Sequence, residues 1–227
     1  MITRRGFLGG GAAGILALHL SELHSWTGTG QTPFPEGDGL SVREAMARRR
    51  TVRQFSDRML REEQLMGVLW AAQGITDRSR GFRTTPSAGA LYPLETFALL
   101  GPKAVAGLAQ GVYSYQPRTT VIERIGDEDS RIPLAEACLG QTWLAGAPVC
   151  LVISAVYGRT TAKYGERGVR YVAIEAGCAA QNVFLLAESM GLSAGIVGAF
   201  EDGKVKDLVG DATAADPLLV MPVGYRA

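Results

Sequence analysis

The sequence predicts an α+β domain, in which strands arranged as hairpins are mixed with helices. Strand-like stretches at 94–100, 111–115 and 120–125 follow one another with turn residues between them, as hairpins do. Helix-like stretches stand before and after this block, which argues against a regular β-α-β order. The longest helical stretch, 167–190, carries small residues at helical spacing, which suits a central helix or a dimer seam.

Two helices are expected before the first of these strands. The first begins at Ser41, because Ser41 and Glu44 stand at the spacing of a capping box, and it ends near Thr51, where β-branched residues disfavour a helix. The second covers about 61–73, where apolar residues recur at helical spacing. Residues 74–90 lack periodicity and are rich in Gly, Ser, Thr and Pro, so we expect a loop.

The second half of the chain mixes both kinds of element. A helix near 131–138 leads to a strand at 149–155, whose unbroken apolar run predicts burial on both faces. The long helix ends before Gly191, a residue typical of the position after a helix C-cap. The remaining elements are a strand at 193–197, a short helix near 202–209 and a last strand at 217–223.

The first 24 residues are predicted to be a twin-arginine signal segment, and residues 25–40 a linker to a folded domain at 41–227. An arginine pair, Arg4-Arg5, precedes an uncharged stretch from Gly9 to Leu20. This stretch is shorter than the roughly 20 residues of a bilayer-spanning helix, so no stable membrane span is expected. The layout predicts export to a periplasmic or other extracytoplasmic location; an ordinary N-terminus is the alternative.

Charge and composition exclude several classes of function. The chain has 23 Lys and Arg against 22 Asp and Glu, a balance that argues against a nucleic-acid binder. Both histidines, His19 and His24, fall in the predicted signal segment, so the folded domain has no imidazole for Ser-His-Asp catalysis or zinc ligation. Its chemistry must therefore come from Arg, Lys, Tyr, carboxylates or a bound cofactor. The three cysteines form no C-x-x-C motif and are expected to be core thiols, unless an exported chain pairs two of them.

Four segments carry residues suited to a site. The cluster Arg48–Arg53 is either a solvated helix end or an anion pocket, in which guanidinium forks and a threonine hydroxyl bind a phosphate. The small residues of Pro86–Pro93 let backbone amides approach a flat ligand, unless this is simply an irregular loop. Glycines in Ala194–Phe200 bracket the end of a strand, either at a ligand site or for backbone shape. The pair Lys163-Tyr164 offers a proton donor or acceptor, although a surface cation beside a half-buried aromatic is the commoner arrangement.

Taken in order, these segments resemble the nitroreductase superfamily. The resemblance covers roughly residues 41–225 and is carried by Arg49–Phe55, Leu69–Gly74, Pro86–Pro93, Tyr171–Leu192 with Glu175-Ala176-Gly177 and Ala180-Gln181-Asn182, and Ala194–Phe200. The Pro-Ser-Ala-Gly form and Lys163-Tyr164 are most similar to the SagB-type dehydrogenase branch, which includes thiazole- and oxazole-forming peptide oxidases. The resemblance implies a mixed, mostly antiparallel central sheet flanked by helices, with a long central helix.

The resemblance also implies an FMN-dependent oxidoreductase, usually a homodimer with the flavin at the subunit interface. It implies that the FMN phosphate and ribityl chain are held by Arg49, Arg50, Thr51 and Arg53. It implies that the flavin is lined by Ser87, Ala88, Gly89 and Leu91, and that backbone amides reach the isoalloxazine edge from Gly195, Ile196, Val197 and Gly198. Lys163 and Tyr164 match a pair implicated in proton transfer in the azoline-oxidising members.

The expected function is hydride transfer through FMN in a ping-pong cycle, on an azoline-type peptide or on a nitro- or quinone-like small molecule. NAD(P)H stays open as the electron donor, because Val197 stands where many nitroreductases have an acidic residue. A non-catalytic flavin-binding protein on the same fold is the alternative. A nucleic-acid binder that uses Arg48–Arg53 is a third hypothesis, which the net charge of +1 disfavours.

Overall fold

The computed structural model describes residues 23–25, 40–210 and 214–227. Most of the predicted signal segment and linker lies outside the described residues, so their boundaries stay predictions. The backbone of strand β1 (Leu23–Ser25) is described, and it pairs with β6 at one edge of the sheet. The sequence predicted no strand there. Among the described helices, none is long and apolar enough to be a candidate membrane span.

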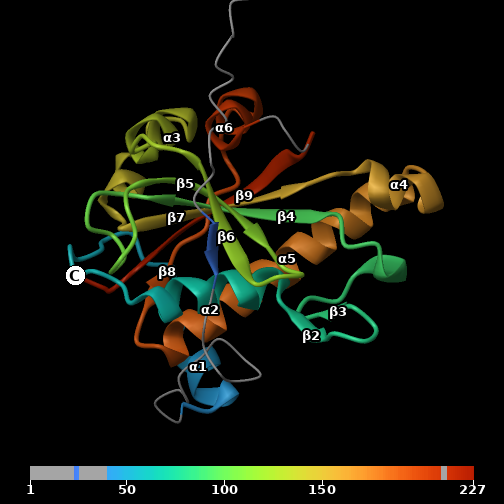
Figure 1. Cartoon of the computed structure of the whole chain (residues 1–227), viewed down its shortest axis with the longest axis horizontal. Helices are drawn as coiled ribbons and strands as arrows, with labels where there is room; N and C mark the ends of the chain where they lie inside the picture. The colour runs from blue at the N-terminus through green and yellow to red at the C-terminus, as the bar shows by residue number, and fades with distance from the viewer. Residues whose placement is uncertain (1–22, 26–39, 211–213) are drawn as a thin grey trace, which may run out of the picture.

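A central antiparallel sheet organises the domain (Figure 1). Within the described residues it has seven strands in the order β1-β6-β5-β4-β7-β9-β8, and each neighbouring pair is antiparallel. The strands beyond β1 are β4 (Leu94–Leu100), β5 (Gly111–Gln116), β6 (Val121–Gly126), β7 (Val149–Ala155), β8 (Ser193–Ala194) and β9 (Asp216–Gly224). The predicted hairpin block and the buried strand at 149–155 are confirmed.

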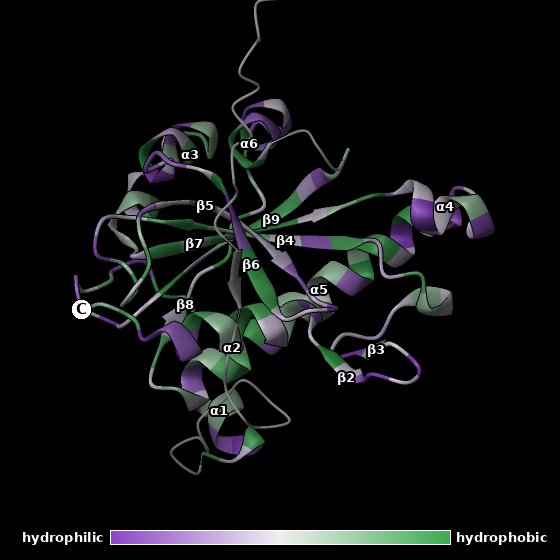
Figure 2. Ribbon diagram, viewed as in Figure 1, coloured by the Kyte–Doolittle hydropathy of each residue, from purple (hydrophilic) through white to green (hydrophobic). Residues whose placement is uncertain are grey.

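Helices cover both faces of this sheet (Figure 1). On one face lie α2 (Glu62–Gln73) and α5 (Arg167–Ser189), with α1 (Val42–Arg48) packed on α5. On the other face lie α3 (Arg131–Ala137), the 3₁₀ helix η2 (Thr142–Gly146) and α6 (Asp202–Val209). Strand β7 separates two apolar clusters, because its alternate residues point to opposite faces. Figure 2 shows the apolar character of β7 at the centre and the hydrophilic character of α4 (Gly158–Tyr164) at the periphery.

The helix ends follow the local signals in the sequence. Ser41 caps α1: its hydroxyl accepts from the Glu44 amide at 3.2 Å, and the Ser41 amide donates to the Glu44 carboxylate at 2.8 Å. At the end of α5, Gly191 has φ +70° and its amide donates to the carbonyl of Glu188 at 3.1 Å. The Leu192 amide donates to the carbonyl of Ala187 at 2.8 Å, which completes a Schellman motif. Both predicted boundaries are confirmed.

Three predictions from the sequence are corrected. The expected loop at 74–90 contains a small hairpin of β2 (Ile75–Asp77) and β3 (Phe82–Arg83), followed by the 3₁₀ turn η1 (Ala88–Ala90). The expected strand at 193–197 is shorter, and of its later residues only Val197 makes a bridge, to Val220. Helix α4 was not expected, since its Gly and Thr residues have low helix propensity; it is held by packing on α5. All three cysteines are free thiols; Cys138 and Cys150 are buried as expected, whereas Cys178 is only half-buried.

Candidate functional site

The arginine segment Arg49–Arg53, which follows α1, is joined to the sheet next to the glycine loop Ala194–Phe200. Thr51 forms a parallel bridge with Ala194, and the Val52 amide donates to the carbonyl of Ala194 at 2.9 Å. A Cβ on Gly195 would lie 2.7 Å from the carbonyl oxygen of Val52. Glycine therefore permits this close approach, and the tertiary structure brings together two segments from opposite halves of the sequence.

Two of the arginines are held on aromatic faces. The guanidinium carbon of Arg49 lies 5.2 Å from the ring centre of Phe184, and that of Arg53 lies 5.6 Å from the ring centre of Trp143. Neither arginine forms an ion pair with another residue in the described part of the chain. A cation–π contact holds each guanidinium near an aromatic face and leaves N–H groups available, so both side chains suit an oxyanion.

Arg50 lies differently. Its Nη1 donates to the carbonyls of Ala47 at 3.0 Å and of Arg49 at 2.8 Å, at the C-terminal end of α1. These carbonyls carry the negative end of the helix dipole, which a guanidinium stabilises. For Arg50 the structure has the helix-end arrangement that the sequence left open as the alternative to an anion pocket.

The glycine loop offers fewer amides than the sequence predicted. The Gly195 amide donates to the carbonyl of Pro222 at 2.9 Å, and the Val197 amide donates to the carbonyl of Val220 at 2.8 Å. Alternate residues of an extended segment point to opposite sides, so the amides of Ile196 and Gly198 face away from β9. The expectation that four consecutive amides are presented to a ligand is therefore wrong for Gly195 and Val197.

The second half of the predicted site meets at η1. Gly89 has φ +64°, and a Cβ on it would lie 2.7 Å from the Tyr164 hydroxyl oxygen and 3.0 Å from Lys163 Nζ. The Lys163 ammonium lies 5.3 Å from the centre of the Tyr164 ring, and Tyr164 packs edge-to-face on Tyr171. The Pro86–Pro93 loop and the Lys163-Tyr164 pair, predicted separately, are thus in contact.

A buried carboxyl beside this loop was not predicted as a site residue. Glu175 of α5 is only 3% exposed, and burial raises its pKa to about 7. A hydrogen bond from the Ser87 hydroxyl, and to a smaller extent the charge of Arg83, partly oppose this rise in the pKa. The Oε1 atom of Glu175 has no hydrogen-bond partner among the described residues. One signal in the sequence was available: a lone acidic residue in the small-residue stretch of the long helix.

Helix α5 separates the two halves of the predicted site within one chain. Phe184, which supports Arg49, lies nine residues after Glu175, which bonds Ser87. Nine residues span about 14 Å of an α-helix. Figure 1 shows α5 running from α4 at one end to α1 at the other. One chain therefore brings together Arg49, Thr51 and Arg53 with the glycine loop, and separately Ser87 and Gly89 with Lys163 and Tyr164.

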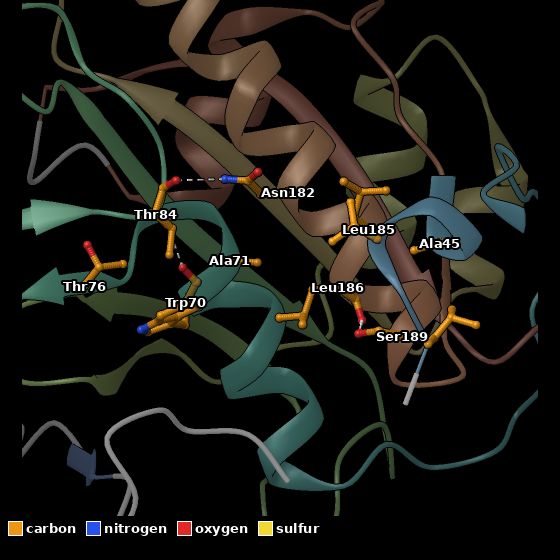
Figure 3. A pocket seen from close by; sticks show the side chains of 11 residues that line it. Ala45, Trp70, Ala71, Thr76, Thr84, Asn182, Leu185, Leu186 and Ser189 are labelled. Atoms are coloured by element: carbon orange, nitrogen blue, oxygen red, sulfur yellow. Dashed lines mark hydrogen bonds between the residues drawn. The ribbon is translucent and has the colours of Figure 1, made fainter. Parts of the chain in front are cut away.

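An apolar groove of about 460 Å³ lies between α1, α2 and α5 (Figure 3). At the polar end of the groove, Asn182 connects α5 to the segment after β3: its Nδ2 donates to the Thr84 carbonyl at 3.2 Å. The neighbouring face of α5 is also uncovered in this chain: Ile174 is 58% exposed, and nothing in the described structure lies within 4 Å of a Cβ on Gly177. Exposed apolar surface of this kind is typical of a face that binds another molecule.

Residues 46–225 match the model of the nitroreductase family. The chain is 43% identical over 198 residues to "Putative nitroreductase MJ1384" of Methanocaldococcus jannaschii, an alignment that covers 87% of this chain and 98% of that protein. It is 29% identical over 146 residues to the Microcin B17-processing protein McbC of Escherichia coli, over 63% of this chain and 54% of McbC. The chain thus spans about half the length of McbC.

Solved structures share the fold. A "putative nitroreductase" from Ralstonia eutropha superposes with a TM-score of 0.75 and 26% identity, over 98% of this chain and 96% of that one. An NADPH:FMN oxidoreductase from Vibrio harveyi, solved in complex with NAD⁺, has a TM-score of 0.58 and 20% identity over 82% of this chain and 68% of that one. The predicted nitroreductase-like α+β fold is confirmed. Because the family model spans most of the described domain, the chain belongs to the nitroreductase family.

Proposed function

We propose that this protein is an FMN-dependent oxidoreductase. One observation carries the proposal: the segment of Arg49, Thr51 and Arg53 is bridged to a loop in which the amides of Ile196 and Gly198 have no hydrogen-bond partner among the described residues. Unpaired guanidiniums, a hydroxyl and backbone amides are the donors that a phosphate and the polar edge of a flavin require. The residues present therefore fit FMN. Bound FMN supplies the hydride chemistry, which is consistent with the lack of histidine in residues 40–227.

In this proposal each residue has a defined role. Arg49, Thr51 and Arg53 bind the phosphate and ribityl chain. The amides of Ile196 and Gly198 donate to the isoalloxazine edge, where a reduced flavin is negatively charged. The residues that line the ring are Ser87, Ala88, Gly89 and Leu91. Lys163 and Tyr164 hold or deliver a proton beside Gly89. They lie so close to Gly89 that a Cβ on this residue would collide with both side chains.

We also propose a homodimer with composite sites. Within one chain the two groups of predicted site residues are held at different parts of α5, since Arg49 lies on Phe184 and Ser87 bonds Glu175, nine residues or about 14 Å earlier in the helix. A second copy crossing the exposed face of α5 would bring its own Ser87–Leu91 loop to the arginine segment of the first. The exposed Ile174 and the open space over Gly177 suit such close packing.

For the substrate we propose two classes, an azoline-type peptide and a nitro- or quinone-like small molecule. The similarity to McbC and the Lys163-Tyr164 pair favour the peptide and a SagB-type branch assignment. The similarity to nitroreductases favours the small molecule, with NAD(P)H as the electron donor in a ping-pong cycle. The arginine pair at 4–5 supports export by the twin-arginine route. A non-catalytic flavin-binding protein is the second candidate, because the same donor set would hold FMN without turnover.

The flavin spectrum of the purified chain tests this proposal directly. We expect yellow protein that releases about one FMN per chain on denaturation, since each chain contributes one donor set. Stopped-flow mixing with NADH, NADPH and an azoline peptide should identify the reductant, and a nitroaromatic or quinone should reoxidise the flavin. Folded, colourless protein that ignores added FMN would refute the proposal. Bound FMN that none of these donors reduces would favour the non-catalytic candidate.

Replacing Gly89 with alanine should reduce steady-state turnover strongly and the free energy of unfolding only slightly. The backbone at φ +64° disfavours any side chain, which costs about 1–2 kcal/mol. The new Cβ would also displace the Tyr164 hydroxyl and the Lys163 ammonium, now 2.7 and 3.0 Å from its position. Gly81→Ala is the matched control, because Gly81 has φ +71° with no atom within 4 Å of a Cβ. Urea unfolding and steady-state turnover on both variants check this; equal turnover in the two variants would contradict the role of Lys163 and Tyr164.

A further inference from the structure

A second cavity, of about 570 Å³, lies beside η1 and is separate from the apolar groove. Five segments form its walls: β3, the η1 loop, the start of β4, the turn between β5 and β6, and α4. Its principal charged residues are Arg83, Arg118, Arg159 and Glu95. A cavity of this size accommodates a small organic molecule or a peptide side chain, for which pockets of about 300–1,000 Å³ are usual.

The cavity carries an excess of positive charge, because three guanidiniums face one carboxylate. Arg159 Nη2 pairs with Glu95 Oε1 at 2.5 Å, and Arg159 Nη1 donates to the Tyr92 carbonyl at 3.1 Å. Arg118 is exposed and forms no ion pair in the described part of the chain. One arginine is therefore neutralised, and the charges of the other two are not balanced within the cavity wall.

Arg83 is the fixed element of this group. Its Nη1 donates to Gln73 Oε1 at 2.7 Å, and its guanidinium carbon lies 4.6 Å from the centre of the Tyr92 ring. Partial burial lowers the pKa of Arg83, and the carboxyls of Glu95 and Glu175 only partly offset this effect. A cation that has lost solvation gains most from a ligand of opposite charge. The hydrogen bond to Gln73 and the cation–π contact with Tyr92 hold Arg83 in position before any ligand arrives.

The backbone of the wall is held in conformations that L-residues rarely adopt. Ala90 has φ +54° and Tyr92 has φ +46°. Such strain persists where the surrounding structure over-determines it, as at ligand sites. In this conformation the aromatic ring of Tyr92 lies against the guanidinium of Arg83. Leu91, which is proposed to line the flavin, lies in the same wall of the cavity.

We infer that this cavity binds the carboxylate of an organic-acid substrate, through Arg83, Arg118 and Arg159; the inference rests on the proposed oxidoreductase function. A guanidinium fork matches a carboxylate, and the apolar atoms of Leu91 and Pro117 in the wall suit the carbon body of such an acid. Arg159 and Lys163 stand four residues apart on α4, so they share one face of the helix. A substrate anchored at Arg159 would extend toward Lys163, Tyr164 and the loop proposed to line the flavin.

Matched ligands with and without a charge test the inference. Isothermal titration of the protein as isolated should show that 4-nitrobenzoate binds at least about tenfold more tightly than 4-nitrobenzamide, as expected for a charge-assisted bond. Arg118→Gln should remove most of that difference, and Arg159→Gln should also reduce it because it leaves the Glu95 carboxylate unpaired in the wall. Both variants should leave the binding of the amide unchanged. Arg78→Gln is the control, since Arg78 is exposed in the neighbouring β2–β3 turn and does not line the cavity. Equal binding of the acid and the amide would overturn the inference.

The sign of the effect at Glu95 gives a second test. Glu95→Gln removes the one carboxylate of the wall and frees Arg159, so 4-nitrobenzoate should bind more tightly to this variant. Weaker binding of the acid would show that the cavity prefers a cation, and would overturn the inference. Inorganic phosphate that displaces the acid at equal concentration would overturn its assignment to an organic acid.

Flavin content, measured by absorbance on the same samples, distinguishes failure of this inference from failure of the proposed function. Folded protein that lacks flavin and does not bind added FMN refutes the oxidoreductase. Bound flavin without a preference for the acid refutes only the carboxylate site.

Discussion

Replacing Arg49 and Arg53 together with alanine should weaken FMN binding by at least about a hundredfold. A hydrogen bond from a charged donor contributes about 1.5–3 kcal/mol, and each factor of ten in the dissociation constant corresponds to about 1.4 kcal/mol. Both guanidiniums make cation–π contacts with aromatic rings and have no acidic partner within the described chain, so their N–H groups are available to the phosphate. Titration of apoprotein with FMN, followed by quenching of flavin fluorescence, measures the change.

The control for this prediction comes from the same cluster. Arg48→Ala combined with Arg50→Ala removes the same charge, but Arg48 pairs with Glu44 and Arg50 bonds the carbonyls at the end of α1. This pair should leave FMN affinity much less changed. Equal losses in the two double variants would show that binding depends on the charge of the cluster alone, and would contradict the specific roles of Arg49 and Arg53.

Replacing Glu175 with glutamine should raise the free energy of unfolding at pH 8 by up to about 3 kcal/mol, and by less than about 1 kcal/mol at pH 5. The carboxyl has a pKa of about 7 in the fold, against 4.5 for the unperturbed group, because burial disfavours its charge. The folded state therefore binds this proton more tightly than the unfolded state. The stability that wild type gains from this tighter proton binding is fully present below the pKa of Glu175 in the unfolded state. It is lost as the pH rises through the pKa of Glu175 in the folded state.

Urea unfolding of wild type and variant at both pH values, at one protein concentration, checks this result. Glu188→Gln is the control, since Glu188 is a half-buried carboxyl near the other end of α5. A gain for Glu175→Gln that is the same at pH 5 and pH 8 would contradict burial of an ionisable carboxyl. A gain confined to high pH would show that the protein retains a destabilising group beside Ser87, as is usual where function requires it.

The sequence by itself determined the parts of this protein that depend on local interactions. The capping box at Ser41 and the glycine after α5 set their helix ends, because each involves hydrogen bonds within a few residues. The apolar run at 149–155 identified the buried strand of the sheet, and the ordered motifs identified the family. Helix α4 was missed for the same reason: its local propensity is low, and its stability comes from α5.

Only the tertiary structure decided how the candidate residues are combined. Pairing with β9 takes up the amides of Gly195 and Val197, and a sequence motif cannot show which carbonyls lie opposite. The contact of Gly89 with Tyr164, and the burial of Glu175, arise between elements far apart in the chain. Their chemistry depends on solvation and on distances set by the packing of α4, α5 and η1. The sequence therefore determined which residues are available for chemistry, and the packing decided which of them meet, because burial and contact are properties of the folded chain.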